Sequence, residues 1–102
     1  MQIAMVGLGR MGANMVRRLL GDGHACVVHD LDPQARRALE QAGATGAATL
    51  EELVSLLAPP RVVWLMVPAA AVDAAIASLA PLLDSGDTIV DGGNTHYRDD
   101  VR

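Results

Sequence analysis

The sequence predicts an α/β fold with a doubly wound parallel sheet, and the order of its apolar segments carries this prediction. Four apolar runs show no alternation of polar and apolar residues, which is typical of strands covered on both faces. Segments with apolar residues at helical spacing lie between these runs, and strands that alternate with helices form parallel sheets with right-handed crossovers. The apolar runs are residues 3–6, 26–28, 62–67 and 89–90.

Four helices are expected between the strands, and local signals mark where two of them begin. Asp32 and Pro33 supply an N-cap and a first-turn proline to the second helix. Thr49 and Glu52 form a capping box at the start of the third helix. A short strand near residues 44–47 completes a sheet that ends after about five strands. The helical stripes lie within residues 11–20, 35–42, 50–57 and 72–83, and the first of them includes Met11.

The composition indicates a packed domain that binds neither nucleic acid nor a membrane. Of the 102 residues, 51% are hydrophobic and 20% are charged, which suffices for a core. The net charge of −4 arises from 12 acidic residues and 8 arginines, without a basic cluster that would follow a phosphate backbone. No apolar stretch reaches the roughly 20 residues that span a bilayer. We therefore expect one domain over residues 1–102.

The cysteine and histidine content indicates a reducing compartment and no metal site. Cys26 is the single cysteine and cannot form an internal disulfide, so a cytoplasmic location is expected for the chain. Cys26 itself is expected to be a small, buried apolar residue. Three scattered histidines and one cysteine lack the spacing of metal ligands. His29 is expected to be a half-exposed strand end and not a ligand.

A glycine-rich motif, G-x-G-x-x-G, follows the first strand directly. In this motif the first glycine allows a tight turn, the second lets the backbone approach a pyrophosphate, and the third lets helix and strand pack closely. The motif alone is weak evidence, but here it opens an amphipathic helix whose positive N-terminal dipole favours phosphate. The sequence therefore predicts a Rossmann-type dinucleotide-binding fold. The motif consists of Gly7, Leu8, Gly9, Arg10, Met11 and Gly12.

Asp30 and Leu31 indicate which dinucleotide is bound. Asp30 ends the second strand, and a carboxylate there can accept hydrogen bonds from both adenosine ribose hydroxyls but would repel a 2′-phosphate. Proteins that bind NADP normally place an arginine nearby, whereas the next residue here is Leu31. The sequence therefore predicts NAD as the cofactor. The alternative is that Asp30 is a solvated residue that only starts a turn before the helix cap Asp32.

The end of the fourth apolar segment is expected to complete the cofactor site. Val67 and Pro68 follow the point where the chain crosses to the other half of the sheet, so their loop and the glycine loop should flank the topological switch point. Met66 and Val67 are predicted to pack against the cofactor, although sheet core is an equally good interpretation of Met66. Arg10 is expected either to contact the pyrophosphate or to face water.

Several segments of the chain resemble a known enzyme family. Residues 7–15 resemble the β-hydroxyacid dehydrogenase superfamily. Residues 50–54 and 81–87, and above all D-G-G-N-T-H-Y-R-D at 91–99, resemble 6-phosphogluconate dehydrogenases. The related 3-hydroxyisobutyrate and tartronate-semialdehyde dehydrogenases carry an Asp-x-Ser-Thr type of sequence there, and a cofactor domain of that kind is the alternative. A second alternative is a free-standing nucleotide-sensing module.

The resemblance implies a role in the pentose phosphate pathway and in gluconate utilisation. Members of this family oxidise 6-phosphogluconate at C3 with a nicotinamide cofactor and decarboxylate the product to ribulose 5-phosphate. Asn94 is implied to contact substrate near C3, and we expect it to link substrate and cofactor; the alternative is a tight turn in which Asn94 caps the next helix. The NADP-dependent branch of the family has an Asn-Arg type of sequence where this chain has Asp30 and Leu31. The resemblance therefore favours the NAD-dependent branch for this chain.

The resemblance also implies that catalysis needs more protein than this chain contains. The family's general base is a lysine and its general acid a glutamate, both well downstream, and this chain has no lysine. No catalytic residue is therefore assigned. A C-terminal helical domain that binds substrate and forms the dimer interface is expected to be absent, and the full-length protein is expected to be a homo-oligomer.

Overall fold

The structure, a computed structural model, describes residues 2–92, and these alternate strands and helices in the order that the sequence predicts. The short strand expected near residues 44–47 is present as a two-residue strand. The elements are β1 (Gln2–Val6), α1 (Arg10–Gly21), β2 (Ala25–His29), α2 (Pro33–Gln41), β3 (Thr45–Gly46), α3 (Leu50–Ser55), β4 (Val62–Leu65), α4 (Ala69–Leu79), the 3-10 turn η1 (Ala80–Leu82) and β5 (Thr88–Asp91).

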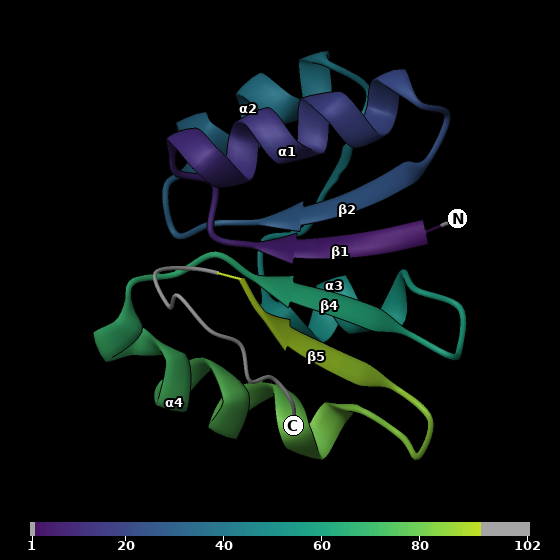
Figure 1. Cartoon of the computed structure of the whole chain (residues 1–102), viewed down its shortest axis with the longest axis vertical. Helices are drawn as coiled ribbons and strands as arrows, with labels where there is room; N and C mark the ends of the chain where they lie inside the picture. Colours follow the sequence, from purple (N-terminus) through teal and green to yellow (C-terminus); the bar gives the residue numbers. More distant parts are fainter. Residues whose placement is uncertain (1, 93–102) are drawn as a thin grey trace.

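The five strands form one parallel sheet in the order β3-β2-β1-β4-β5. Helices α1 and α2 cover one face of the sheet, and α3 and α4 cover the other (Figure 1). The strand order reverses next to β1, because the chain first builds outward to β3 and then crosses back to β4. In the register, Val6 lies opposite both His29 and Leu65, so the ends of β1, β2 and β4 meet at one edge. The doubly wound fold is confirmed, with its switch point between β1 and β4.

Two separate cores lie on the two faces of the sheet. Successive residues of β1 point to opposite faces, so Met5 belongs to one core and Val6 to the other. This burial on both faces explains why the strands read as unbroken apolar runs. Cys26 is buried as a small apolar residue, as expected. The core under α1 and α2 contains Met5, Leu8, Val16, Cys26, Val28, Leu39 and Ala44, whereas the core under α3 and α4 includes Val27, Leu53, Val63, Leu65 and Leu79.

Both predicted helix caps are present. The side chain of Asp32 accepts a hydrogen bond of 2.9 Å from the backbone N–H of Gln34. Thr49 Oγ1 accepts one of 3.0 Å from the backbone N–H of Glu52, but Glu52 Oε1 accepts from Ala48 and not from Thr49 itself. These caps satisfy N–H groups that a helix start leaves without intrahelical partners. They fix the points at which α2 and α3 leave the ends of β2 and β3.

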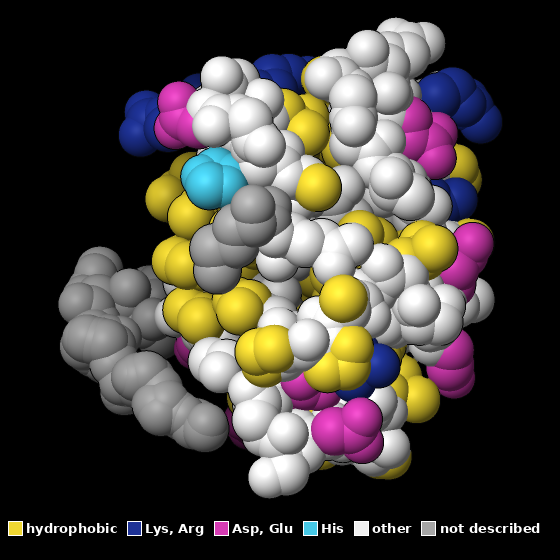
Figure 2. Space-filling model, turned by 90° about the vertical axis from the view of Figure 1, so that its right-hand side faces the viewer, with side chains coloured by type: hydrophobic (Ala, Val, Ile, Leu, Met, Phe, Trp, Pro, Cys, Tyr) yellow, Lys and Arg dark blue, Asp and Glu magenta, His cyan; other side chains and the backbone are white. Residues whose placement is uncertain are grey.

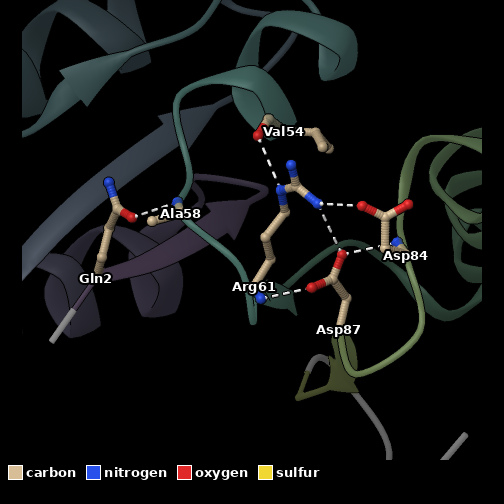
Figure 3. Close-up of polar contacts among 6 residues, drawn as sticks. All are labelled: Gln2, Val54, Ala58, Arg61, Asp84 and Asp87. Carbon is tan, nitrogen blue, oxygen red and sulfur yellow. Dashed lines mark hydrogen bonds and ion pairs between the residues drawn. The ribbon is translucent and has the colours of Figure 1, made fainter.

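An ion-pair cluster ties the start of β4 to the loop that precedes β5 (Figure 3). Asp87 accepts hydrogen bonds from the backbone N–H of Arg61 at 2.6 Å, from Arg61 Nη1 at 3.0 Å and from the backbone N–H of Asp84 at 2.8 Å. Arg61 Nε also donates to the carbonyl oxygen of Val54, at the end of α3. Figure 2 faces this amino edge of the sheet and shows acidic side chains spread over it, with several of them in the lower part of the view. The cluster thus connects β4 and the loop before β5 at the end of the sheet opposite the switch point.

Candidate functional site

A cavity of about 610 Å³ opens at the carboxyl edge of the sheet, at the switch point between β1 and β4. Every predicted cofactor residue within the described range lines this cavity. Asn94 lies outside the described residues. Five lining residues were not predicted from the sequence. The predicted residues are Gly7, Leu8, Gly9, Arg10, Met11, Gly12, Asp30, Leu31, Met66, Val67 and Pro68, and the additional ones are Val6, His29, Leu50, Ala71 and Ala75.

The three motif glycines have different surroundings. Gly7 has a φ of +99°, and an added Cβ there would lie 2.6 Å from the carbonyl oxygen of Met66. A Cβ on Gly12 would collide with the carbonyl oxygen of Gly7, where α1 packs on the end of β1. Gly9, in contrast, has a φ of −64° and nothing within 4 Å of an added Cβ. Gly7 and Gly12 are therefore required by the fold, whereas the space beside Gly9 is open to a ligand.

Asp30 fixes the glycine loop to the end of β2. Its Oδ2 accepts a hydrogen bond of 2.6 Å from the backbone N–H of Leu8, and its Oδ1 accepts one of 2.9 Å from the backbone N–H of Asp32. Arg36 Nη1 donates to the carbonyl oxygen of Asp30 at 3.0 Å. Asp30 therefore does start the turn before α2, but it also reaches across to the glycine loop. Each carboxylate oxygen has a second lone pair, so a ligand hydroxyl can be accepted at the same time.

The end of β4 contributes to both cores and to the cavity. Met66 Sδ accepts a hydrogen bond of 3.2 Å from Trp64 Nε1, and Met66 packs against the core under α1 and α2. Val67 packs against the core on the other face. Because both residues also line the cavity, the two interpretations of Met66 are compatible: one side of it is core and the other faces the site.

The rim of the cavity carries exposed apolar side chains. Leu31 is 90% exposed and Met11 is 65% exposed. The prediction that Met11 belongs to the buried stripe of its helix is wrong, because Met11 lies in the first turn of α1, where its side chain is exposed at the rim of the cavity. Arg10 is exposed and lines the cavity at the N-terminus of α1, where the helix dipole already favours an anion.

The structure corrects the prediction for His29. The residue is 7% exposed, not half-exposed, and its Nδ1 lies 2.9 Å from the carbonyl oxygen of Ala47. The loop between β3 and α3 covers the ring, and sequence alone does not show this cover because the loop returns to β2 from a distance of 18 residues. His29 is therefore a buried part of the cavity wall.

Two features were searched for in the described part of the chain and not found, a metal site and a membrane-spanning helix. Within residues 2–92 no group of three or more histidine, cysteine, aspartate or glutamate side chains could hold a metal ion. None of the helices in that range is both long and apolar enough to cross a membrane. Asp91 ends β5 opposite Leu65, so β5 ends at the same carboxyl edge as the cavity.

The parallel sheet, the glycine loop and the acid at the end of β2 define a dinucleotide-binding domain of the Rossmann type. Residues 2–102 match the family described as the NAD binding domain of 6-phosphogluconate dehydrogenase. The chain therefore belongs to this family and is an NAD(P)-binding domain of its oxidoreductases.

Individual relatives agree with this assignment. The chain is 47% identical over 103 residues to a relative from Haloferax volcanii and 40% identical over 105 residues to one from Bacillus subtilis, both named NAD(+)-dependent, decarboxylating 6-phosphogluconate dehydrogenase. These alignments cover 100% and 98% of the chain, but 34% and 22% of the relatives. A Plasmodium falciparum 6-phosphogluconate dehydrogenase structure superposes with a TM-score of 0.81 at 29% identity, over 95% of this chain and 22% of that one. The chain thus spans about a third or less of these proteins.

Proposed function

We propose that this chain binds NAD(H) in the cavity at the carboxyl edge of the sheet and prefers it to NADP(H). The position of Asp30 carries the proposal, because its carboxylate lines the cavity beside the glycine loop. There it favours ribose hydroxyls as donors and opposes a 2′-phosphate. Leu31, the neighbouring rim residue, brings no positive charge that would offset this repulsion.

In this binding mode, each part of the cavity wall contacts a different part of the cofactor. The glycine loop and the first turn of α1 hold the pyrophosphate, with Gly9 giving the closest approach and Arg10 adding a positive charge. Asp30 and Leu31 contact the adenosine half. The residues that follow β4, Met66, Val67 and Pro68, pack against the dinucleotide from the other side of the switch point.

The double variant Asp30→Asn, Leu31→Arg is expected to reverse the cofactor preference. It removes the carboxylate and adds a guanidinium that suits a phosphate. Because Leu31 is 90% exposed, the arginine replaces no core packing. By calorimetry, the ratio of the dissociation constants for NADP and NAD should fall by about tenfold or more, or roughly 1.4 kcal/mol. Asp32→Ser, which keeps a helix cap, is the control and should leave the ratio unchanged. Wild-type protein that binds NADP as tightly as NAD would contradict the proposal.

The full-length protein is proposed to be an NAD-dependent enzyme, active as a homo-oligomer, that oxidatively decarboxylates 6-phosphogluconate to ribulose 5-phosphate. The names of the relatives from Haloferax volcanii and Bacillus subtilis support this reaction. The sequence D-G-G-N at 91–94 supports it too, since its first residue, Asp91, ends β5 opposite Leu65, next to the residues of the β4 end that line the cavity. Asn94 is proposed to hold a cofactor hydroxyl and a substrate hydroxyl through its amide, which can both donate and accept.

The 102-residue chain alone is expected to show no dehydrogenase activity, because it contains no lysine that could serve as the family's general base. The measurement follows NADH absorbance with 6-phosphogluconate in excess. Cofactor binding, measured in the same preparation, is the control that the chain is folded. Turnover that survives purification and exceeds a heat-inactivated sample would show that the base is supplied by another residue type.

A further inference from the structure

We propose that His29 is a specificity-determining residue of the cofactor cavity, which favours an unphosphorylated adenosine when its ring is neutral and a phosphorylated one when its ring is protonated. The inference rests on the proposed function, that the cavity binds a nicotinamide dinucleotide. It adds a second determinant beside Asp30, and it makes the choice between NAD and NADP depend on pH.

The contact with Ala47 sets the tautomer of the neutral ring. His29 Nδ1 lies 2.9 Å from the carbonyl oxygen of Ala47 within a buried environment. A carbonyl oxygen can only accept, so Nδ1 carries the hydrogen. The neutral ring therefore presents Nε2 as a hydrogen-bond acceptor.

Nε2, the other ring nitrogen, is the atom through which His29 would meet a ligand in the cavity. Within residues 2–92 the only hydrogen bond of the imidazole is the one through Nδ1. The single fully buried side-chain nitrogen or oxygen without a partner in that range is His24 Nδ1, so His29 Nε2 retains access to the surface. His29 lines the cavity and only 7% of its surface is exposed, so we take the cavity as the surface that Nε2 reaches.

Few charged groups surround the ring. Arg10 from α1 and Asp30 from the end of β2 are the charged residues that line the same cavity. Arg36 of α2 reaches the carbonyl oxygen of Asp30, and Glu52 of α3 accepts from Ala48, next to the partner of His29. Helix α4 contributes only two alanines to the lining. A proton gained by His29 therefore changes the charge of the adenosine end of the cavity substantially.

The neutral and the protonated ring suit different ligands. The neutral ring offers Nε2 as an acceptor for a hydroxyl or amino hydrogen of adenosine. On taking up a proton from solvent, Nε2 becomes a donor and the ring becomes a cation that attracts a phosphate and offsets the charge of Asp30. Histidine is the side chain that normally makes this change between pH 5 and pH 8.

The test compares NAD and NADP binding by calorimetry at pH 8 and pH 5.5, in wild-type protein and in His29→Gln. A phosphate monoester itself titrates near pH 6, so the difference between the two proteins is the quantity of interest. When the pH is lowered from 8 to 5.5, the dissociation constant for NADP divided by that for NAD should fall. This fall is expected to be about fivefold larger in wild-type protein than in His29→Gln. His24→Gln, at the opposite end of β2, is the matched control and should behave as wild type.

The outcomes separate the two claims. If neither nucleotide binds at pH 8, the proposed function fails and this inference fails with it. If NAD binds but wild type and His29→Gln show the same change of ratio with pH, the inference alone is overturned.

A measurement on wild-type protein removes any dependence on how well the variant folds. The imidazole C–H chemical shift of His29 is followed against pH, without nucleotide and with either one saturating. By linkage, NAD should move the midpoint of this titration to lower pH and NADP should move it to higher pH. A midpoint that neither nucleotide moves would overturn the inference.

Discussion

Gly9→Ala is expected to abolish most NAD binding while leaving the fold intact. In the free protein nothing lies within 4 Å of a Cβ at this position, and the backbone there is acceptable for alanine. With a dinucleotide bound, the methyl group would occupy the space through which the pyrophosphate approaches the backbone N–H groups. Loss of one charge-assisted hydrogen bond corresponds to roughly 2 kcal/mol, so the dissociation constant should rise by about 30-fold or more. Calorimetry and thermal melting measure the two effects.

Gly12→Ala is the matched comparison within the same motif. Its Cβ would collide with the carbonyl oxygen of Gly7, so α1 would have to move away from the end of β1. This variant should therefore lose thermal stability as well as NAD binding. A Gly9→Ala protein that melts as early as Gly12→Ala, or that binds NAD normally, would contradict the distinction drawn between a glycine for the ligand and a glycine for packing.

Asp87→Asn is expected to lower the melting temperature by about 5 °C or more without changing NAD affinity. The Asp87 side chain is 1% exposed and accepts three hydrogen bonds from Arg61 and Asp84, of which an asparagine amide can keep only those to one oxygen. Asp84→Asn is the control, because its side chain is 75% exposed and its contact with Arg61 is 3.3 Å long. Equal melting of the two variants would contradict this account of the cluster.

The same cluster should make the fold sensitive to acid. Hydrogen bonds from the backbone N–H groups of Asp84 and Arg61, more than the nearby guanidinium charge, lower the pKa of Asp87 below its ordinary value of 3.8. A carboxyl group with a lower pKa in the folded state stabilises the fold above its ordinary pKa and loses this contribution as pH falls through the lowered value. The wild-type melting temperature should therefore drop below about pH 4 more steeply than that of Asp87→Asn.

The sequence predicts those parts of this structure that depend on residues close together in the chain. The caps at Asp32 and Thr49 were predicted because each side chain bonds to a backbone group two or three residues away. The cavity lining followed from the glycine motif, since the switch point of a parallel sheet is set by strand order. In contrast, Arg61 and Asp87 are 26 residues apart, and no local pattern connects them. The burial of His29 depends on a loop that follows another strand, and the exposure of Met11 depends on the position of the first turn of α1 at the rim of the cavity.

The two ends of strand β4 have different roles, one in stability and the other in cofactor binding. Arg61 precedes its first residue and anchors the amino edge, whereas Met66 follows its last residue and lines the cavity. Five residue steps of extended chain place Arg61 and Met66 about 16 Å apart, beyond the roughly 7–10 Å within which substitutions usually influence one another. Changes at the two ends should therefore combine additively. Such a domain can exchange one cofactor specificity for another while its fold is secured independently, at the opposite end of the same strands.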